Sequence, residues 1–341
     1  MWGRGIDIEH QCTKLFKEHC DSIGDSRREA KDQAIASGVR GFTEQAQKTG
    51  IHSFGTSNRY VSVWKELAKF AKEEKGVRDL ADISNRTVKE FLHHKMKEDC
   101  NVYSSYRTVV SAVNKMNAAL NRIEGVEKNW TNVTDKMREF GRHNLPTEKD
   151  IEKDLKDKGL AIGRGFIDAK EVVNNFDSTK PDLAFTAQVQ YETGCRISEI
   201  AVIKENQLRG IGVDPYTAQE KGVVNVVGKG GKEREVYLDP QTYRKLEEKI
   251  ENSDKKVIDK ETKEEIKVIK VARTTYTNEV RDAAARAGQP YTGTHDFRHS
   301  WVQDRIKELV TEGYSKSEAR VATSDEIGHV REYITETYLK A

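Results

Sequence analysis

The strongest constraint on the fold is a helical repeat of apolar residues between residues 57 and 123. Apolar side chains recur every three to four positions in three successive stretches, and Ser57 is placed to cap the first. We therefore expect helices starting near Ser57, over 85–97 and over 104–123, packed into an all-helical bundle. The residues predicted to face inward are Tyr60, Val61, Trp64, Leu67, Ala68, Ala71, Val88, Phe91, Leu92, Val109, Ala112, Val113, Met116 and Leu120.

The predicted bundle carries an excess of positive charge. Residues 51–123 hold 13 lysines and arginines against 8 aspartates and glutamates, although the whole chain has a net charge of only +2. The outer face of the third helix is expected to present Tyr106, Arg107, Asn114 and Lys115. A basic helical face fits a contact with nucleic acid, and an ordinary solvated surface explains the charge equally well.

The second half of the chain combines helices with short strands. Apolar runs at 223–227 and 233–238 flank Gly228-Lys229-Gly230-Gly231, which predicts a β-hairpin. A second small β element is expected within 257–271. Helices are predicted after Asp168, over 276–287, over 297–312 and after the capping box Ser315-Lys316-Ser317-Glu318. This half therefore has a mainly α fold with a small β-sheet (α+β).

Changes in composition, together with proline and glycine residues that interrupt the periodic patterns, divide the chain into four parts. Residues 1–50 look like two polar helices, over 6–23 and 26–36, with too little apolar surface for a core of their own. Residues 51–145 are the helical domain, and Asn144-Leu145-Pro146 opens a charged linker over 146–165. The α+β domain follows over 166–341.

The sequence argues against membrane and secreted classes. No apolar run approaches the roughly 20 residues needed to cross a bilayer, and the first residues contain no apolar secretion signal. The four cysteines, Cys12, Cys20, Cys100 and Cys195, form no CxxC pair and no zinc spacing. We expect reduced thiols in a cytoplasmic, nucleoid-associated protein.

Two arginines, two histidines and a late tyrosine suit chemistry on a phosphodiester. Arg196 lies in Thr193-Gly194-Cys195-Arg196-Ile197-Ser198-Glu199, and His295-Asp296-Phe297-Arg298 precedes Gly328-His329 and Tyr338. A phosphodiester resists attack because its non-bridging oxygens are negatively charged. Arginine forks can neutralise these oxygens, histidines can move protons, and a tyrosine oxygen can attack phosphorus. This set favours DNA strand exchange.

These segments resemble the tyrosine recombinase (phage integrase) family. Residues 193–199 are similar to its first arginine box and residues 228–234 to its lysine hairpin. His295-Asp296-Phe297-Arg298-His299, Gly328-His329 and Tyr338 are similar to the remaining boxes. Residues 53–123 more loosely resemble its helical core-binding domain, so the resemblance implies a separate all-α DNA domain before an α+β catalytic domain.

The resemblance implies a role for each matched residue. Tyr338 would attack the scissile phosphate, giving a 3′-phosphotyrosyl enzyme and a free 5′-hydroxyl. Arg196 and Arg298 would hold the non-bridging oxygens. His295 would accept and return the proton of the tyrosine, and His329 would bond the phosphate.

The lysine hairpin and the first arginine box supply the remaining roles. Lys229 would protonate the departing 5′ oxygen, with Lys232 and Arg234 as further candidates for phosphate contact. Glu199 would brace active-site side chains rather than react.

The resemblance also implies the partners. The expected substrate is double-stranded DNA with a specific recombination site, bound by a homo-tetramer on two duplexes and used to integrate or excise a mobile element. An accessory DNA-bending or directionality protein is a further expected partner. Because the phosphotyrosine keeps the bond energy, neither metal nor ATP nor another cofactor is required. Only Leu339, Lys340 and Ala341 follow Tyr338, whereas relatives usually continue into a tail that docks on a neighbouring protomer, so protomer docking stays open.

Simpler interpretations of the same residues stay open. Arg196 and Glu199 could form a surface ion pair. Tyr333 competes with Tyr338, but five residues turn a helix by about 140°, so only one of them can face the arginines. His295 and His299 could bind zinc on one helical face, although Arg298 would repel the cation. The alternative functions are a type IB topoisomerase and a catalytically silent DNA-binding regulator.

Overall fold

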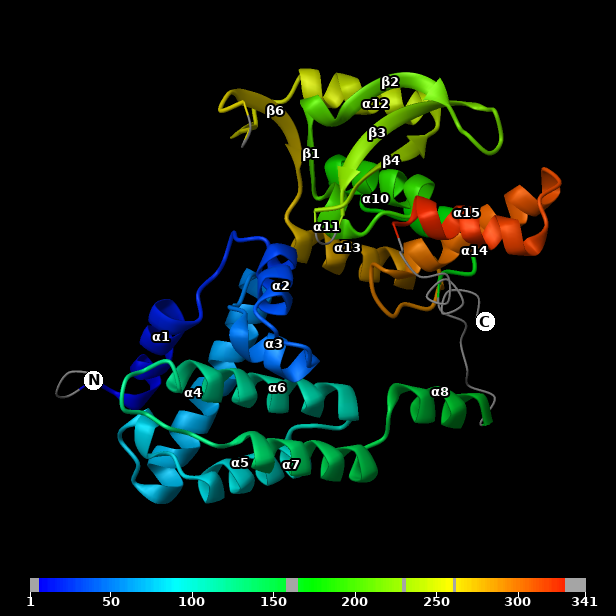
Figure 1. Ribbon diagram of the computed structural model, residues 1–341. Helices are drawn as coiled ribbons and strands as arrows, with labels where there is room; N and C mark the ends of the chain where they lie inside the picture. The colour runs from blue at the N-terminus through cyan, green and yellow to red at the C-terminus, as the bar shows by residue number, and fades with distance from the viewer. Residues whose placement is uncertain (1–5, 158–164, 229–230, 260–261, 329–341) are drawn as a thin grey trace. The chain divides into compact units, whose positions relative to one another are not determined.

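The computed structural model describes residues 6–157, 165–228, 231–259 and 262–328 (Figure 1). The chain divides into two compact units, residues 1–161 and 162–341. Among the described residues, no helix combines the length and apolar character that a membrane span requires.

The first unit is helical. Its α-helices are α1 (Ile8–His19), α2 (Arg27–Ala36), α3 (Phe42–Lys48), α4 (Phe54–Lys75), α5 (Asn85–Glu98), α6 (Tyr103–Leu120), α7 (Thr131–Asn144) and α8 (Glu148–Asp157). The predicted inward faces of α5 and α6 are confirmed, because Phe91, Leu92, Val113 and Met116 are buried in one core. Helix α4 begins three residues before the predicted Ser57, and the Ser53 hydroxyl caps it by accepting the N–H of Thr56.

The N-terminal helix α1 shares the core of this unit. Cys12 and Leu15 of α1 are completely buried in the same cluster as Trp64 of α4. The Gln11 side chain accepts the N–H of Leu80 at 3.0 Å and donates to the carbonyl of Arg78 at 2.9 Å. Residues 6–50 are therefore built into the helical unit, and α8 occupies part of the predicted linker.

Helix α7 was not predicted, and it covers the face of α6 that we expected to be open. Tyr106 is completely buried, and a Cβ added at Gly141 of α7 would lie 2.3 Å from its ring. Asn114 accepts a hydrogen bond from the Thr134 hydroxyl of α7. Lys115 is buried and donates to the carbonyl of Thr49, just after α3, at 2.7 Å.

The predicted DNA-contact face of α6 is therefore wrong for Tyr106, Asn114 and Lys115. Their side chains hold α6 to α7 and to the end of α3 inside the unit. Arg107 alone of the four predicted residues is exposed.

The second unit has the predicted α+β fold. Its helices are α9 (Ala169–Asn174), α10 (Pro181–Thr193), α11 (Ile197–Ile200), α12 (Pro240–Glu251), α13 (Arg273–Arg286), α14 (Asp296–Thr311) and α15 (Lys316–Glu326). Its strands are β1 (Val202–Lys204), β2 (Leu208–Val213), β3 (Glu220–Val227), β4 (Glu233–Leu238), β5 (Lys256–Ile258) and β6 (Glu265–Lys270). The predicted caps at Asp168 and Ser315 are both confirmed.

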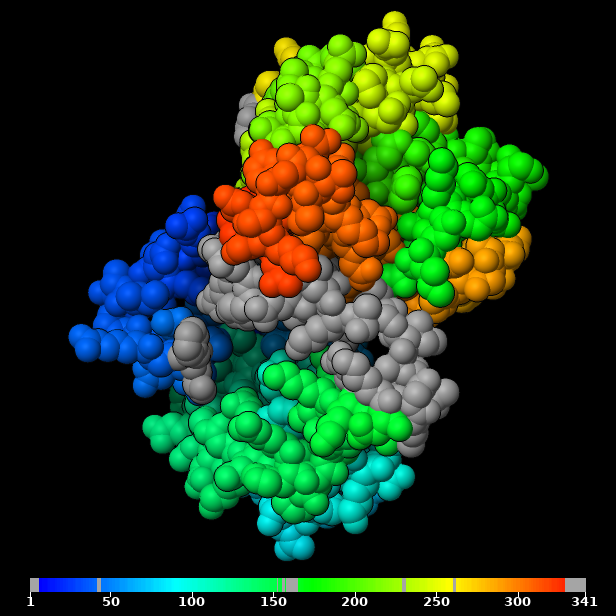
Figure 2. Space-filling view, turned by 90° about the vertical axis from the view of Figure 1, so that its right-hand side faces the viewer, coloured from blue at the N-terminus to red at the C-terminus, as the bar shows by residue number. Residues whose placement is uncertain are grey.

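The described strands form two small antiparallel sheets, in the orders β2-β3-β4 and β1-β6-β5. The predicted hairpin is confirmed as β3 and β4, with Val226 opposite Arg234 and Val227 opposite Glu233. Apolar side chains on one face of this hairpin pack with Leu246 of α12. Helix α15, orange-red in Figure 2, lies against the yellow-green strands of the same sheet. The hairpin and the end of α15 are thus neighbours.

Candidate active site

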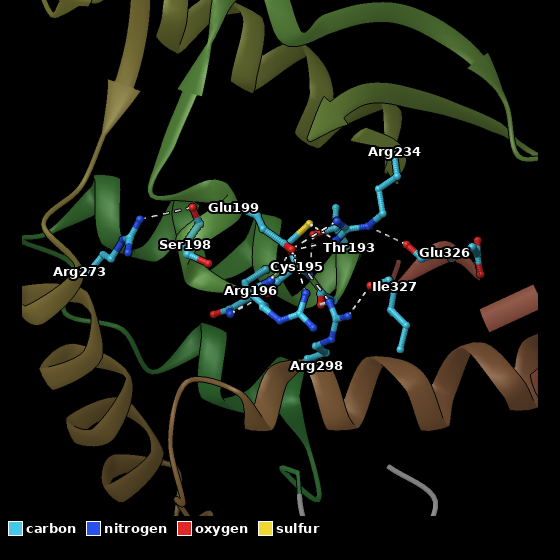
Figure 3. A network of polar contacts seen from close by, with 12 residues as sticks. Thr193, Cys195, Arg196, Ser198, Glu199, Arg234, Arg273, Arg298, Glu326 and Ile327 are labelled. Atoms are coloured by element: carbon cyan, nitrogen blue, oxygen red, sulfur yellow. Dashed lines mark hydrogen bonds and ion pairs between the residues drawn. The ribbon is translucent and has the colours of Figure 1, made fainter. Parts of the chain in front are cut away.

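A buried carboxylate lies at the centre of an arginine cluster (Figure 3). The Glu199 side chain is only 2% exposed. It accepts hydrogen bonds from Arg196 Nη1 at 3.0 Å and from Arg234 Nη2 at 2.8 Å. Nη1 of Arg298 lies 3.9 Å from the same carboxylate. Three segments that are distant in sequence therefore meet at Glu199.

The arginines keep this carboxylate ionised. Burial alone would raise the pKa of Glu199, but the hydrogen bond and charge of Arg234, the N–H of Arg196 and the charge of Arg298 lower it below its ordinary value. Three guanidinium groups then face a single carboxylate. The cluster keeps an excess of positive charge, which favours binding of an anion.

Arg196 is the most accessible of the three arginines. It lies at the start of α11, where its backbone N–H donates to Glu199 Oε2 at 2.8 Å. Its side chain is 29% exposed, whereas that of Arg298 is 0% exposed and that of Arg234 is 8% exposed. Glu199 thus orients a guanidinium group that still reaches the surface.

Arg298 joins the first arginine box to the end of α15. Its Nη1 donates to the carbonyl of Gly194 at 2.9 Å, and its Nη2 donates to the carbonyl of Ile327. The approach of α14 to α10 depends on Gly194, which has φ 59° and ends α10. A Cβ at this position would lie 2.7 Å from the ring of Trp301 on α14. Only glycine allows both the backbone turn and this close contact.

Arg234 faces inward, which differs from the predicted phosphate contact. Its Nε donates to the carbonyl of Glu326 at 2.8 Å, and its Nη2 lies 3.6 Å from the Cys195 sulfur. The other predicted contact of the hairpin, Lys232, is exposed. Of the two, Lys232 alone keeps a side chain that is open to solvent.

His295 lies beside the cluster as a neutral imidazole. Partial burial and the positive charges of Arg298 and Arg196 lower its pKa to about 4. At pH 7 the ring can therefore accept a proton. The ring of the buried His299 lies edge-on to it, with centroids 5.5 Å apart. Within the part of the chain that the structure describes, no three His, Cys, Asp or Glu side chains are placed to hold a metal ion.

The described residues do not include Lys229, His329 or Tyr338. They do include Gly228 and Gly328, which directly precede Lys229 and His329. A Cβ at Gly228 would lie 3.2 Å from Arg234 Nη1 and 3.3 Å from Glu199 Oε1. A Cβ at Gly328 would lie 3.4 Å from Arg234 Cδ. The residues that directly precede Lys229 and His329 therefore both lie close to the arginine cluster.

One further arginine beside the cluster was missed. Arg273, the first residue of α13, is exposed, and its Nη2 lies 3.5 Å from the carbonyl of Ser198 in the first arginine box (Figure 3). It belongs to none of the motifs, and only the packing of α13 brings it there. The sequence signal available was that Arg273 is a basic residue shortly after the predicted second β element.

Comparison with known proteins finds solved structures with a similar fold. The XerH site-specific recombinase bound to difH substrate in a pre-cleavage complex is 12% identical, with a TM-score of 0.55, covering 98% of this chain and 90% of that chain. A lambda integrase dimer bound to a COC′ core site is 14% identical, with a TM-score of 0.50, covering 98% and 81%. At these identities the likeness shows a shared fold.

No curated protein matches this sequence. Residues 167–340, more than half of the chain, match the phage integrase family. The matched region contains the arginine cluster and both of its flanking glycines. The chain therefore belongs to the phage integrase family.

Proposed function

We propose that this protein is a site-specific DNA recombinase that cleaves and rejoins strands through a 3′-phosphotyrosyl intermediate. The observation that carries the proposal is the convergence of Arg196 and Arg298 on the buried Glu199. Gly228 and Gly328, which directly precede Lys229 and His329, lie close to the same cluster. Membership of the phage integrase family supports the same reaction.

In this proposal the arginines hold the scissile phosphate. The exposed part of the Arg196 side chain offers a planar pair of donors to the non-bridging oxygens. Each charge-assisted hydrogen bond contributes roughly 1.5–3 kcal/mol, so bonds that strengthen as charge develops lower the barrier substantially. Arg298 adds positive charge from a buried position, where water screens it little.

Proton transfer is assigned to the remaining residues. His295 is neutral at pH 7, so it can take the proton of Tyr338 as the phenol attacks phosphorus. Lys229 donates a proton to the departing 5′ oxygen, and His329 bonds the phosphate. The phosphotyrosine then reacts with a 5′-hydroxyl of a second strand, which releases Tyr338 and restores a phosphodiester.

Double-stranded DNA with a specific recombination site is the proposed substrate. The solved relatives are described as a recombinase bound to difH substrate and an integrase dimer bound to a core site. We propose a tetramer on two duplexes that integrates or excises a mobile element with an accessory DNA-bending or directionality protein. Contacts with phosphates should dominate affinity and make it strongly salt-dependent.

Covalent trapping tests the proposal. The full-length protein is incubated with a pool of labelled duplexes that carry a nick and randomised flanking sequence. Cleavage near the nick releases a short fragment, so the protein stays attached and a denaturing gel shows the complex. Sequencing the attached DNA then gives the target site.

Two variants identify the nucleophile. Tyr338→Phe should bind the selected duplex normally and form no covalent complex, because the attacking oxygen is gone. Tyr333→Phe is the matched control and should still attach. Attachment by Tyr338→Phe would show that another residue is the nucleophile. Relaxation of supercoiled plasmid without joining of separate duplexes would instead indicate a topoisomerase.

A further inference from the structure

We propose that Arg234 is a positioning residue for DNA cleavage and not a phosphate ligand. It ties together the lysine hairpin, the first arginine box and the end of α15. This inference rests on the proposed function, because the three elements it joins carry the proposed catalytic groups.

The contacts of Arg234 use both sides of its guanidinium group. The Nε side donates to the carbonyl of Glu326 at 2.8 Å. The Nη side donates to Glu199, with Nη2 at 2.8 Å and Nη1 at 3.3 Å from the carboxylate oxygens. A planar group with fixed donor directions holds its two acceptors at a set separation. With 8% of its side chain exposed, Arg234 is committed to internal partners.

The first element that Arg234 fixes is the hairpin that carries Lys229. Arg234 pairs with Val226 in the β3–β4 register, and the loop closes where the Gly228 N–H donates to the carbonyl of Lys232 at 2.7 Å. A Cβ added at Gly228 would lie 3.2 Å from Arg234 Nη1, so little space separates the loop from the guanidinium group. Arg234 therefore anchors the base of the loop from which Lys229 must reach the leaving oxygen.

The second element is the end of α15, three residues before His329. The last carbonyls of a helix have no partner within the helix. Here Arg234 bonds the carbonyl of Glu326, and Arg298 bonds that of Ile327. The Glu326 side chain is held separately by Arg305 Nη2 at 2.7 Å. Removal of Arg234 would therefore release the backbone of Glu326 while leaving its side chain fixed.

The third element is Glu199, which orients Arg196. Loss of Arg234 would leave Arg196, Arg298, His295 and the buried Cys195 thiol as the charged or titratable groups around this carboxylate among the described residues. The pKa of Glu199 would then rise, because burial opposes ionisation and Arg234 is the main group that offsets it. Protonation of Glu199 would in turn weaken its hold on Arg196.

The test compares Arg234→Met and Arg234→Lys with the unchanged protein on the selected nicked duplex. Two quantities are measured, the Kd for DNA and the rate of covalent attachment at saturating DNA. Methionine keeps the approximate length of the side chain and removes its donors. We expect Arg234→Met to attach about 100-fold more slowly, because small displacements of catalytic groups cost about this much. Its Kd should change less than about threefold, because Arg234 directs its donors to Glu199 and to the carbonyl of Glu326.

Arg234→Lys separates geometry from charge. An ammonium group keeps the charge but cannot reach Glu199 and the Glu326 carbonyl together, so attachment should stay at least about tenfold slow. Arg209→Met is the matched control, because Arg209 is an exposed arginine on β2 of the same sheet. It should attach at the normal rate. Circular dichroism melts show whether each variant is folded. If Arg234→Met does not fold, the attachment rate of Arg234→Lys tests the positioning role.

The pH dependence gives a readout that simple destabilisation does not move. The acid limb of the attachment rate should shift to higher pH in Arg234→Met, and the shift should disappear when Glu199→Gln is added. The positioning role would be overturned if Arg234→Met attached to DNA at an unchanged rate, whether or not its Kd were raised. It would also be overturned if Arg234→Lys were fully active. Failure of the unchanged protein to attach to any duplex would instead overturn the proposed function, and this role with it.

Discussion

Gly194 provides a quantitative test of how the two arginine boxes are held together. Its φ of 59° costs an alanine about 1 kcal/mol or more. A Cβ would also lie 2.7 Å from the Trp301 ring, and overpacking of this kind costs about 1–3 kcal/mol. Gly194→Ala should therefore destabilise the second unit by about 3 kcal/mol. It should also displace the Gly194 carbonyl, which accepts a hydrogen bond from Arg298.

A double-mutant cycle separates the two costs. In a Trp301→Ala background the ring is absent, so only the backbone strain remains and Gly194→Ala should cost about 1 kcal/mol. The coupling energy between the two positions should thus be about 2 kcal/mol. Native-state hydrogen exchange of amides in α14 reads the local free energy of opening without requiring the two units to unfold together. Equal costs of Gly194→Ala in both backgrounds would refute the argument from close contact.

Two further predictions concern the pH dependence of stability. Burial lowers the pKa of Lys115 to about 8 from 10.5, so the unfolded chain binds more protons between these values. The free energy of unfolding of the helical unit should therefore rise as pH increases from 8 to 10.5, and Lys115→Met should remove that part of the slope in urea titrations. Partial burial and the charges of Arg298 and Arg196 lower the pKa of His295 to about 4 from 6.5. Stability of the second unit should consequently be lost as pH falls from 6.5 towards 4, and His295→Gln should flatten this loss; the same slope in the variant would contradict the assignment.

The sequence motifs were sufficient to predict which of the described arginines and carboxylates lie together at the candidate site. Arg298 is far from Arg196 and Glu199 in sequence, and the three side chains meet in space. The contacts of Glu199 also fit the bracing role expected for it. Lys229, His329 and Tyr338 lie outside the described residues, so their roles stay predictions.

The orientation of α6 could not be obtained from its own sequence. Helix α7 has few apolar residues, and only Thr134, Met137 and Gly141 are buried along it, so its apolar content does not mark it as a packed helix. Without α7, polar residues of α6 such as Tyr106 and Asn114 look exposed. Their partners lie on other helices, and a single helical pattern does not contain that information.

The inward position of Arg234 was not predicted, although the sequence held a usable signal. Side chains alternate between the two faces of a strand. Val236 and Leu238 are buried, so Arg234 lies on the same inward face of β4. The basic composition of the hairpin favoured a phosphate contact, whereas strand alternation favoured an internal partner. Strand alternation predicted the observed orientation of Arg234, because it depends on the face of the strand to which a side chain points. Positive charge indicates only what a side chain can bind.

The origin of the groups around Glu199 has a consequence for engineering. Every partner described for this carboxylate belongs to residues 162–341. Chimeric proteins that exchange the helical unit for that of a relative should therefore keep the Glu199 cluster intact. Grafting a foreign hairpin, in contrast, should require transplanting its inward arginine as well.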